Sequence, residues 1–314
     1  MCNSRGCARF VLVFLAVAIT GIVGSPTEGR AELGVLVPAY FYPINSGIGG
    51  DWGQTATAAS KIPVTAIMNP DSGPIPGPAN SDYVTAITNL ENAGGSVVAY
   101  VATWYAGTHD PVKGDLSYVE SEINLYISQY GSLIKGFFLD QMTNDSSSAD
   151  LTYYSTLYSY IKGLPGSHQV IGNPGTSTTE DYLKPGTRGA DTLVTYENDG
   201  QAQPYASAPP ASWVTSYSPD HFANIIYNEP LQNMMADSSL AAQRNVGSIF
   251  VTDQGQGGSN PYAQLPSYWD QEVAAIQSLN AVPEPGALTR LASAALFGSV
   301  AAAARRLGRK RRKV

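Results

Sequence analysis

Eight short apolar runs, separated by polar or helix-like segments, constrain the fold of this chain more than any other feature. The runs are rich in the β-branched and aromatic residues that suit strands covered on both faces. Strands that alternate with helix-like segments predict a parallel sheet closed on itself, a single α/β (β/α)8 TIM barrel of about 250 residues. The runs span residues 34–41, 63–70, 96–103, 134–140, 169–174, 192–197, 222–229 and 246–253.

Several segments between the runs place apolar residues at i, i+3, i+4 and i+7, which is typical of amphipathic helices. The segment after the sixth run is different, because residues 200–210 are rich in proline and alanine and have no helical period. No internal repeat or linker interrupts residues 33–280, so we expect one domain. The helices are expected at residues 82–93, 117–130, 151–161 and 231–244.

The amino-terminal end has the layout of a secretory signal peptide, which we assign to residues 1–31. Two arginines and no acid precede a nearly unbroken apolar run over residues 10–23, and small residues follow. Both cysteines of the chain, Cys2 and Cys7, lie in this segment. The exported domain, residues 32–281, is therefore expected to have no disulfide, no thiol chemistry and no cysteine-based metal site.

The carboxyl-terminal end, residues 282–314, combines Pro283-Glu284-Pro285, an alanine-rich apolar segment and a basic cluster at 305–313. An apolar segment followed by basic residues is typical of a stop-transfer element, whereas a basic nucleic-acid tail would not explain the apolar segment. The arrangement resembles the PEP-CTERM sorting signal of exopolysaccharide-producing bacteria. That resemblance implies a sorting protease that removes the tail, only transient membrane contact, and a secreted or cell-surface protein in a bacterial exopolysaccharide matrix.

The domain between these two ends is strongly acidic. It holds seven Lys and Arg against 22 or 23 Asp and Glu, so it carries about 15 net negative charges. A nucleic-acid partner is excluded on this ground, because nucleic-acid affinity depends on cationic contacts with phosphates. A neutral or cationic partner is favoured.

The residues that end the eight runs should meet at one mouth, because a barrel gathers the carboxyl ends of its strands there. They are carboxylates, amides and aromatics, and Lys and Arg are absent. This composition suits a neutral or amine-bearing polyhydroxylated ligand rather than a phosphate. Any single aromatic is explained better by packing, so their clustering carries the argument. The candidate substrate-binding residues are Tyr40, Asn69, Asp71, Tyr105, Gln141, Asn173, Tyr196, Tyr227, Glu229 and Asp253.

Asp140 and Glu197 are the carboxylates that we expect to carry chemistry, because each directly follows an apolar run. Two carboxylates on different strands of one mouth are what glycosidic cleavage requires. A lone strand-end aspartate is as easily a helix cap, and the second carboxylate favours the catalytic interpretation. Glu229 and Asp253 are reserve candidates, since they occupy equivalent strand ends.

Other chemistries fit the sequence less well. The three histidines, His109, His168 and His221, lack the spacing of a zinc site, and no Gly-x-Ser-x-Gly elbow is present. We therefore expect no metal and no cofactor.

Five segments, in order, are similar to the spherulin-4 family: residues 37–43, 67–74, 100–103, 136–140 and 173–176. The resemblance implies a (β/α)8 barrel and endo-acting hydrolysis of α-1,4-linked galactosamine or N-acetylgalactosamine polymers. Members of the family typically carry an Asp-Glu pair after strand four and a Glu after strand six. Asp140 and Glu197 match this pattern, whereas Gln141 keeps the shape of the missing Glu but cannot ionise.

The first hypothesis is a retaining glycoside hydrolase with Asp140 as the nucleophile and Glu197 as the acid/base. It predicts carboxyl groups about 5–5.5 Å apart, whereas about 6.5–9.5 Å would indicate inversion. The alternative is a non-catalytic polysaccharide-binding matrix protein on the same barrel, which Gln141 favours. A third hypothesis is a surface structural protein whose mouth has no function.

Overall fold

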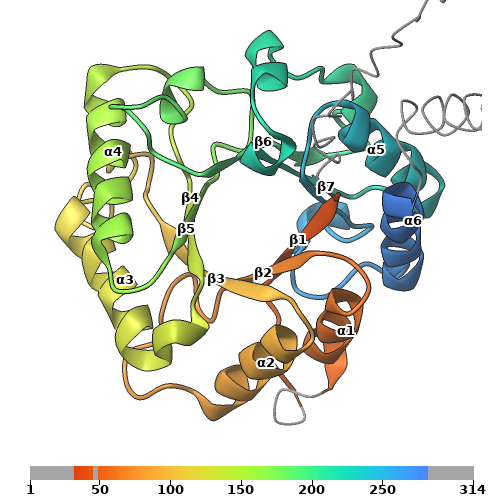
Figure 1. The fold of residues 1–314 in the computed structure, drawn as a ribbon, viewed down its shortest axis with the longest axis horizontal. Helices are drawn as coiled ribbons and strands as arrows, with labels where there is room; N and C mark the ends of the chain where they lie inside the picture. The colour runs from red at the N-terminus through yellow and green to blue at the C-terminus, as the bar shows by residue number, and fades with distance from the viewer. Residues whose placement is uncertain (1–31, 45–48, 282–314) are drawn as a thin grey trace, which may run out of the picture. The chain divides into compact units, whose positions relative to one another are not determined.

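Eight parallel strands form a closed barrel in which each strand pairs with the next and β1 pairs with β8 (Figure 1). This computed structural model describes residues 32–44 and 49–281; the predicted signal peptide and sorting tail lie outside the described residues. The predicted fold class is confirmed. The strands are β1 (Gly34–Ala39), β2 (Val64–Met68), β3 (Ser96–Ala102), β4 (Gly136–Asp140), β5 (Gln169–Gly172), β6 (Thr192–Asp199), β7 (Phe222–Tyr227) and β8 (Ser248–Val251).

Helices surround the barrel on the outside, as Figure 1 shows. The four helices expected from the sequence are present as α2 to α5, and α1 and α6 add two more among the described residues. Within the same residues, no helix combines the length and apolar character needed to cross a membrane. The helices are α1 (Gly50–Ala59), α2 (Ser81–Asn92), α3 (Leu116–Tyr130), α4 (Ser148–Gly163), α5 (Leu231–Gln243) and α6 (Trp269–Ala281).

Two connections of the barrel contain 3-10 turns instead of an α-helix. Between β5 and β6 the chain makes the turn η2 (Glu180–Tyr182). Between β6 and β7 it makes the turns η3 (Tyr205–Ser207), η4 (Ser212–Ser216) and η5 (Pro219–His221). The second case was expected from the prolines and the missing helical period, since proline lacks the N–H that a helix interior needs.

Local sequence explains where the helices begin. The side chain of Asn80 accepts hydrogen bonds from the backbone N–H groups of Asp82 and Tyr83 at the start of α2. Asp115 and Ser147 cap α3 and α4 in the same way. Each cap satisfies an N–H group that has no partner inside its helix. The apolar stripe of each helix then packs on the outer face of the barrel.

Strand β4 shows how the barrel positions its polar residues. Side chains alternate between the two faces of a strand, so Phe138 and Asp140 share one face. The Phe138 ring stacks on Tyr100 of β3 inside the barrel, at a centroid distance of 6.3 Å. A side chain at Gly136 would lie 2.2 Å from the backbone oxygen of Gln169, so only glycine allows β4 and β5 to pair here. Asp140 consequently projects from the carboxyl end of β4 toward the barrel axis.

Candidate active site

Asp140 and Glu197 lie next to each other at the mouth and share one neighbour, Asn173. The Asn173 Nδ2 atom donates to Asp140 Oδ1 at 2.7 Å and to Glu197 Oε2 at 2.6 Å. Asn173 itself is buried, while both carboxylates keep partial exposure. One amide therefore fixes the two acids face to face while leaving them accessible from the mouth.

Backbone hydrogen bonds between strand ends hold the acids in place. Asn173 N donates to Leu139 O at 2.9 Å, which ties the end of β5 to β4. Glu197 N donates to Gly175 O at 2.8 Å. On β6 the pairing with β7 shifts register between Val194 and Tyr196, and this irregularity precedes Glu197. Such bulges re-aim the side chains that follow them.

Three tyrosines surround the pair. Tyr100 OH donates to Asp140 Oδ2 at 2.7 Å, and Tyr262 OH donates to Glu197 Oε1 at 2.5 Å. Tyr40 lies between these two, with its ring edge-on to Tyr100 at 5.6 Å and to Tyr262 at 5.3 Å. Burial, followed by the charge of the nearby carboxylates, raises the pKa of all three phenols. All three therefore remain protonated, and Tyr100 and Tyr262 act as donors to the acids.

The surroundings raise the pKa of both acids but act differently on each. Burial raises the pKa of Asp140, while hydrogen bonds from Tyr100, Asn173 and the backbone of Gln141 lower it again. Burial raises the pKa of Glu197 first, and the negative charge of Asp140 raises it further. Hydrogen bonds from Tyr262 and Asn173 lower the pKa of Glu197 again, so each acid has donors that favour its charged form. Two carboxylates this close do not both ionise easily, because the charge of Asp140 raises the pKa of Glu197.

Strained backbone gathers at the same mouth. Trp104, Tyr105 and Ala106, which follow β3, have φ values of 51°, 54° and 54°, and Gln141 after β4 has a φ of 54°. The left-handed region costs non-glycine residues roughly 1–2 kcal/mol each. Hydrogen bonds stabilise it here, because Gln141 O accepts from Tyr105 N at 2.8 Å and from Thr103 Oγ1 at 2.9 Å. Strain of this kind is often found at functional sites.

Three further predicted residues also lie at or near the mouth. Gln141 follows Asp140 directly, and its Oε1 atom is buried without a hydrogen-bond partner among the described residues. Tyr227, at the end of β7, lies close enough to Glu197 and Asp199 for their charges to raise its pKa, although burial raises it more. Tyr105 contacts Gln141 through its backbone, and its ring packs on His109 at a centroid distance of 4.3 Å.

The two reserve acids have structural partners instead. Glu229 is 1% exposed, and its Oε1 atom accepts from Asn233 Nδ2 at 2.6 Å and from Gln201 Nε2 at 3.3 Å. Asp253 accepts from the backbone N of Ser267 at 3.0 Å and from the hydroxyl group of the same residue. Glu229 therefore fastens the loop after β6, and Asp253 fastens the loop before α6. Neither side chain is joined to Asp140 or Glu197.

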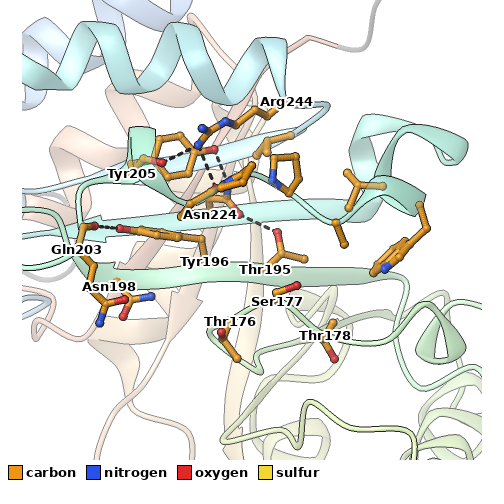
Figure 2. A pocket seen from close by; sticks show the side chains of 17 residues that line it. Thr176, Ser177, Thr178, Thr195, Tyr196, Asn198, Gln203, Tyr205, Asn224 and Arg244 are labelled. Atoms are coloured by element: carbon orange, nitrogen blue, oxygen red, sulfur yellow. Dashed lines mark hydrogen bonds between the residues drawn. The ribbon is translucent and has the colours of Figure 1, made fainter.

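Three other candidate residues lie outside the group around Asp140. Tyr196 is buried, and its hydroxyl group donates to Gln203 O (Figure 2). Because successive side chains of a strand point to opposite faces, its ring lies on the other face of β6 from Glu197. Asn69 accepts from Gly73 N at 3.0 Å and stabilises its own loop. Asp71 is exposed in that loop. A residue at the end of a strand lies at the mouth end of the barrel axis, but its side chain can point in any of several directions.

The sequence analysis missed Tyr100 and Tyr262. Tyr100 was assigned to the apolar interior of β3, although its position two residues before the strand end places its hydroxyl group at the mouth. Tyr262 comes from the loop after β8, which analysis of strand ends alone does not reach. Among the described residues, no cluster of three or more His, Cys, Asp or Glu side chains is arranged to hold a metal ion.

Comparison with solved structures shows the fold. The Aspergillus clavatus Sph3 crystal structure, a complex with GalNAc, has a TM-score of 0.62 at 23% identity and covers 79% of this chain and 98% of that chain. The endo-1,4-β-mannanase of Rhizomucor miehei has a TM-score of 0.50 at 12% identity, covering 81% of this chain and 98% of that chain. The chain therefore shares its barrel fold with these two proteins.

Comparison of sequences shows the family. Residues 34–276 match the family described as Spherulation-specific family 4. Spherulin-4 of Physarum polycephalum is 33% identical over 279 residues, which is 86% of this chain and 78% of that protein. The match spans all eight strands and both mouth acids, so the chain belongs to the spherulin-4 family.

Proposed function

We propose that this protein is a secreted, endo-acting glycoside hydrolase that cleaves α-1,4-linked galactosamine or N-acetylgalactosamine exopolysaccharide. The observation that carries the proposal is the joining of Asp140 and Glu197 by a single amide nitrogen in an accessible mouth. The GalNAc bound to the similar Sph3 barrel supports an amino-sugar ligand. The predicted signal peptide and sorting tail support export and processing by a sorting protease.

The proposed reaction uses the two acids in turn. Ionised Asp140 attacks the anomeric carbon while Glu197 donates its proton to the departing glycosidic oxygen. A glycosyl ester on Asp140 results, and Glu197 is left ionised. Glu197 then removes a proton from water, which attacks the anomeric carbon and releases Asp140. The three donors on Asp140 suit the nucleophile, and the pKa of Glu197, which burial and the charge of Asp140 raise, suits the acid.

The geometry supports retention of configuration. Because Asn173 Nδ2 reaches an oxygen of each acid, those two oxygens can be no further apart than about 5.3 Å, an upper limit compatible with the roughly 5–5.5 Å between the carboxyl groups of retaining enzymes. Inverting enzymes need a wider gap between the two carboxyl groups, because the attacking water must fit beside the sugar.

The purified mature protein, incubated with partly deacetylated galactosaminoglycan, tests the proposal through the release of new reducing ends. Hydrolysis predicts many chain breaks and products of several lengths. The natural chain has Gln141 where the family pattern has a glutamate. This difference favours a second candidate function, a matrix protein that binds the polymer without cleaving it. Retention of the protein on the polymer without new reducing ends would favour that second function.

The Gln141→Glu chain tests the departure from the family pattern. We expect the natural protein to be active already, and the added carboxylate to raise the pKa of neighbouring Asp140 by like-charge repulsion. Asp140 would then ionise at higher pH, so the acidic limb of kcat/KM should move to higher pH. The measurement is the pH profile of polymer cleavage, with exposed Gln271→Glu on α6 as the control for added charge. Activity that arises only in Gln141→Glu would show that the natural chain binds without cleaving.

The Tyr262→Phe chain tests the hydrogen bond on Glu197. This bond lowers the pKa of Glu197, so its loss should raise that pKa further. Glu197 must be protonated for the first step. The basic limb of the pH profile of polymer cleavage should therefore move to higher pH. Turnover should fall about tenfold, in keeping with the roughly 1.5 kcal/mol of a hydrogen bond to a charged group.

The matched control is Tyr160→Phe, which loses a phenol hydrogen bond to Asn124 Oδ1 on neighbouring helices. Its pH profile and turnover should equal those of the natural protein. An unchanged basic limb in Tyr262→Phe would contradict the role given to Glu197.

A further inference from the structure

A second pocket, with a volume of about 220 Å³, lies on the outer side of β6, under the loop that connects β6 to β7 (Figure 2). It occupies the place where a regular barrel would carry the helix after β6, which the 3-10 turns η3 and η4 replace here. The residues that determine its chemistry are Thr176, Ser177, Tyr196, Asn198, Pro210 and Trp213.

This pocket and the candidate active site share one strand. Successive side chains of a strand point to opposite faces, so Glu197 faces the barrel interior while Tyr196 and Asn198 face the outer pocket. The segment after β5 runs beside this strand, since Gly175 O accepts from Glu197 N at 2.8 Å. Thr176 then continues into the pocket wall. The pocket therefore begins at the rim of the mouth.

The pocket offers no free charge. None of the side chains that line it is a carboxylate, and its one cation is Arg244. The Arg244 guanidinium donates to the backbone oxygens of Tyr205, Ala206 and Ala208 at 2.6, 2.8 and 3.1 Å. It also lies over the Tyr205 ring at 4.8 Å. Arg244 thus holds the loop in place and is not available as an anion receptor, so the pocket suits an uncharged ligand.

Uncharged donors and acceptors remain available in this pocket. The side chains of Thr176, Ser177 and Asn198 make no hydrogen bond within residues 32–44 and 49–281, and all three are at least partly exposed. The Trp213 ring is half-buried against Tyr217 and Phe222, at centroid distances of 6.0 and 5.6 Å. A mainly apolar wall with a few oriented polar groups is typical of small-ligand sites. Hydroxyl and amide groups that line one pocket together with an aromatic ring match a pyranose, which has a polar rim and an apolar face.

We propose that this pocket is a second carbohydrate site that binds one uncharged pyranose residue of the polysaccharide. The identity of that polymer rests on the proposed function, whereas the site itself does not. Because the pocket starts at the rim of the mouth, one long chain can occupy both sites. The second contact is then intramolecular, which raises affinity for long chains and leaves short oligosaccharides unaffected.

Titration of the ¹⁵N-labelled natural protein with N-acetylgalactosamine tests the site without requiring hydrolysis. The indole N–H signal of Trp213 should shift and saturate. The signals of Trp52 and Trp269 serve as internal controls, because their indole N–H groups donate to Phe41 O and Gln54 O. Galactosamine, which carries a protonated amine, should cause a smaller shift, since the pocket supplies no counter-charge.

The Ser177→Phe chain provides the matched variant, because it fills the pocket from an exposed position without removing any internal contact. The saturable shift of Trp213 should be lost in it, and kcat/KM on long polymer should fall roughly threefold or more while kcat/KM on short oligosaccharides stays constant. A Trp213 signal that moves with neither sugar, or that still saturates in Ser177→Phe, would overturn the proposal. A shift without any hydrolysis would support this site while refuting the proposed enzyme.

Discussion

Replacing Asp140 with asparagine should reduce turnover by at least about 10⁴-fold while the barrel stays folded. The amide keeps the shape of the carboxylate, and Tyr100 and Asn173 remain as neighbours. It cannot attack the anomeric carbon as an anion, so no glycosyl ester forms. The measurement is the initial rate of release of reducing ends from the polymer.

Asp270→Asn, at an exposed position of α6, makes the same chemical change away from the mouth. Its rate should equal that of the natural protein. The thermal unfolding midpoint of Asp140→Asn should stay the same or rise, because the substitution removes a partly buried charge. Release of oligosaccharides at an undiminished rate by Asp140→Asn would refute its assignment as the nucleophile.

Replacing Glu197 with glutamine should give a loss that depends on the leaving group. On the polymer the departing sugar oxygen needs a proton, so turnover should fall about 10²- to 10⁴-fold. An oligosaccharide with a 4-nitrophenyl leaving group needs no proton for the first step, because nitrophenolate is a stable anion. The first step should then stay fast and the second should become slow, since no base activates water. A burst of nitrophenolate followed by a slow steady state is the expected result.

Glu120→Gln on α3 is the control, because it removes a carboxylate outside the mouth and should leave both substrates unaffected. Equal losses on the polymer and on the nitrophenyl substrate, without a burst, would contradict the acid/base role of Glu197.

The sequence predicted the barrel because each strand is buried on both faces and therefore reads as an apolar run. Parallel pairing also explains why the carboxyl ends of neighbouring strands lie at one end of the barrel, since it brings Ala102 of β3 opposite Asp140 of β4. The position of Asn173 follows from the same rule.

The direction of each side chain could not be predicted in this way. Glu197, Glu229 and Asp253 all follow apolar runs, yet the structure joins only Glu197 of these three to Asp140 through Asn173. The register shift in β6 and the partners of Glu229 and Asp253 decide this, and neither is visible in local sequence. Tyr262 was missed for a related reason, since a loop 65 residues after Glu197 brings it to the site.

The anomeric configuration of the first product tests the central claim most directly. Proton NMR during early cleavage of α-1,4-linked polymer by the natural protein resolves the new reducing ends before they interconvert. The two closely spaced acids predict that the α-anomer appears first. A β-anomer first would contradict Asp140 as a nucleophile, and no new reducing end at all would contradict hydrolysis itself.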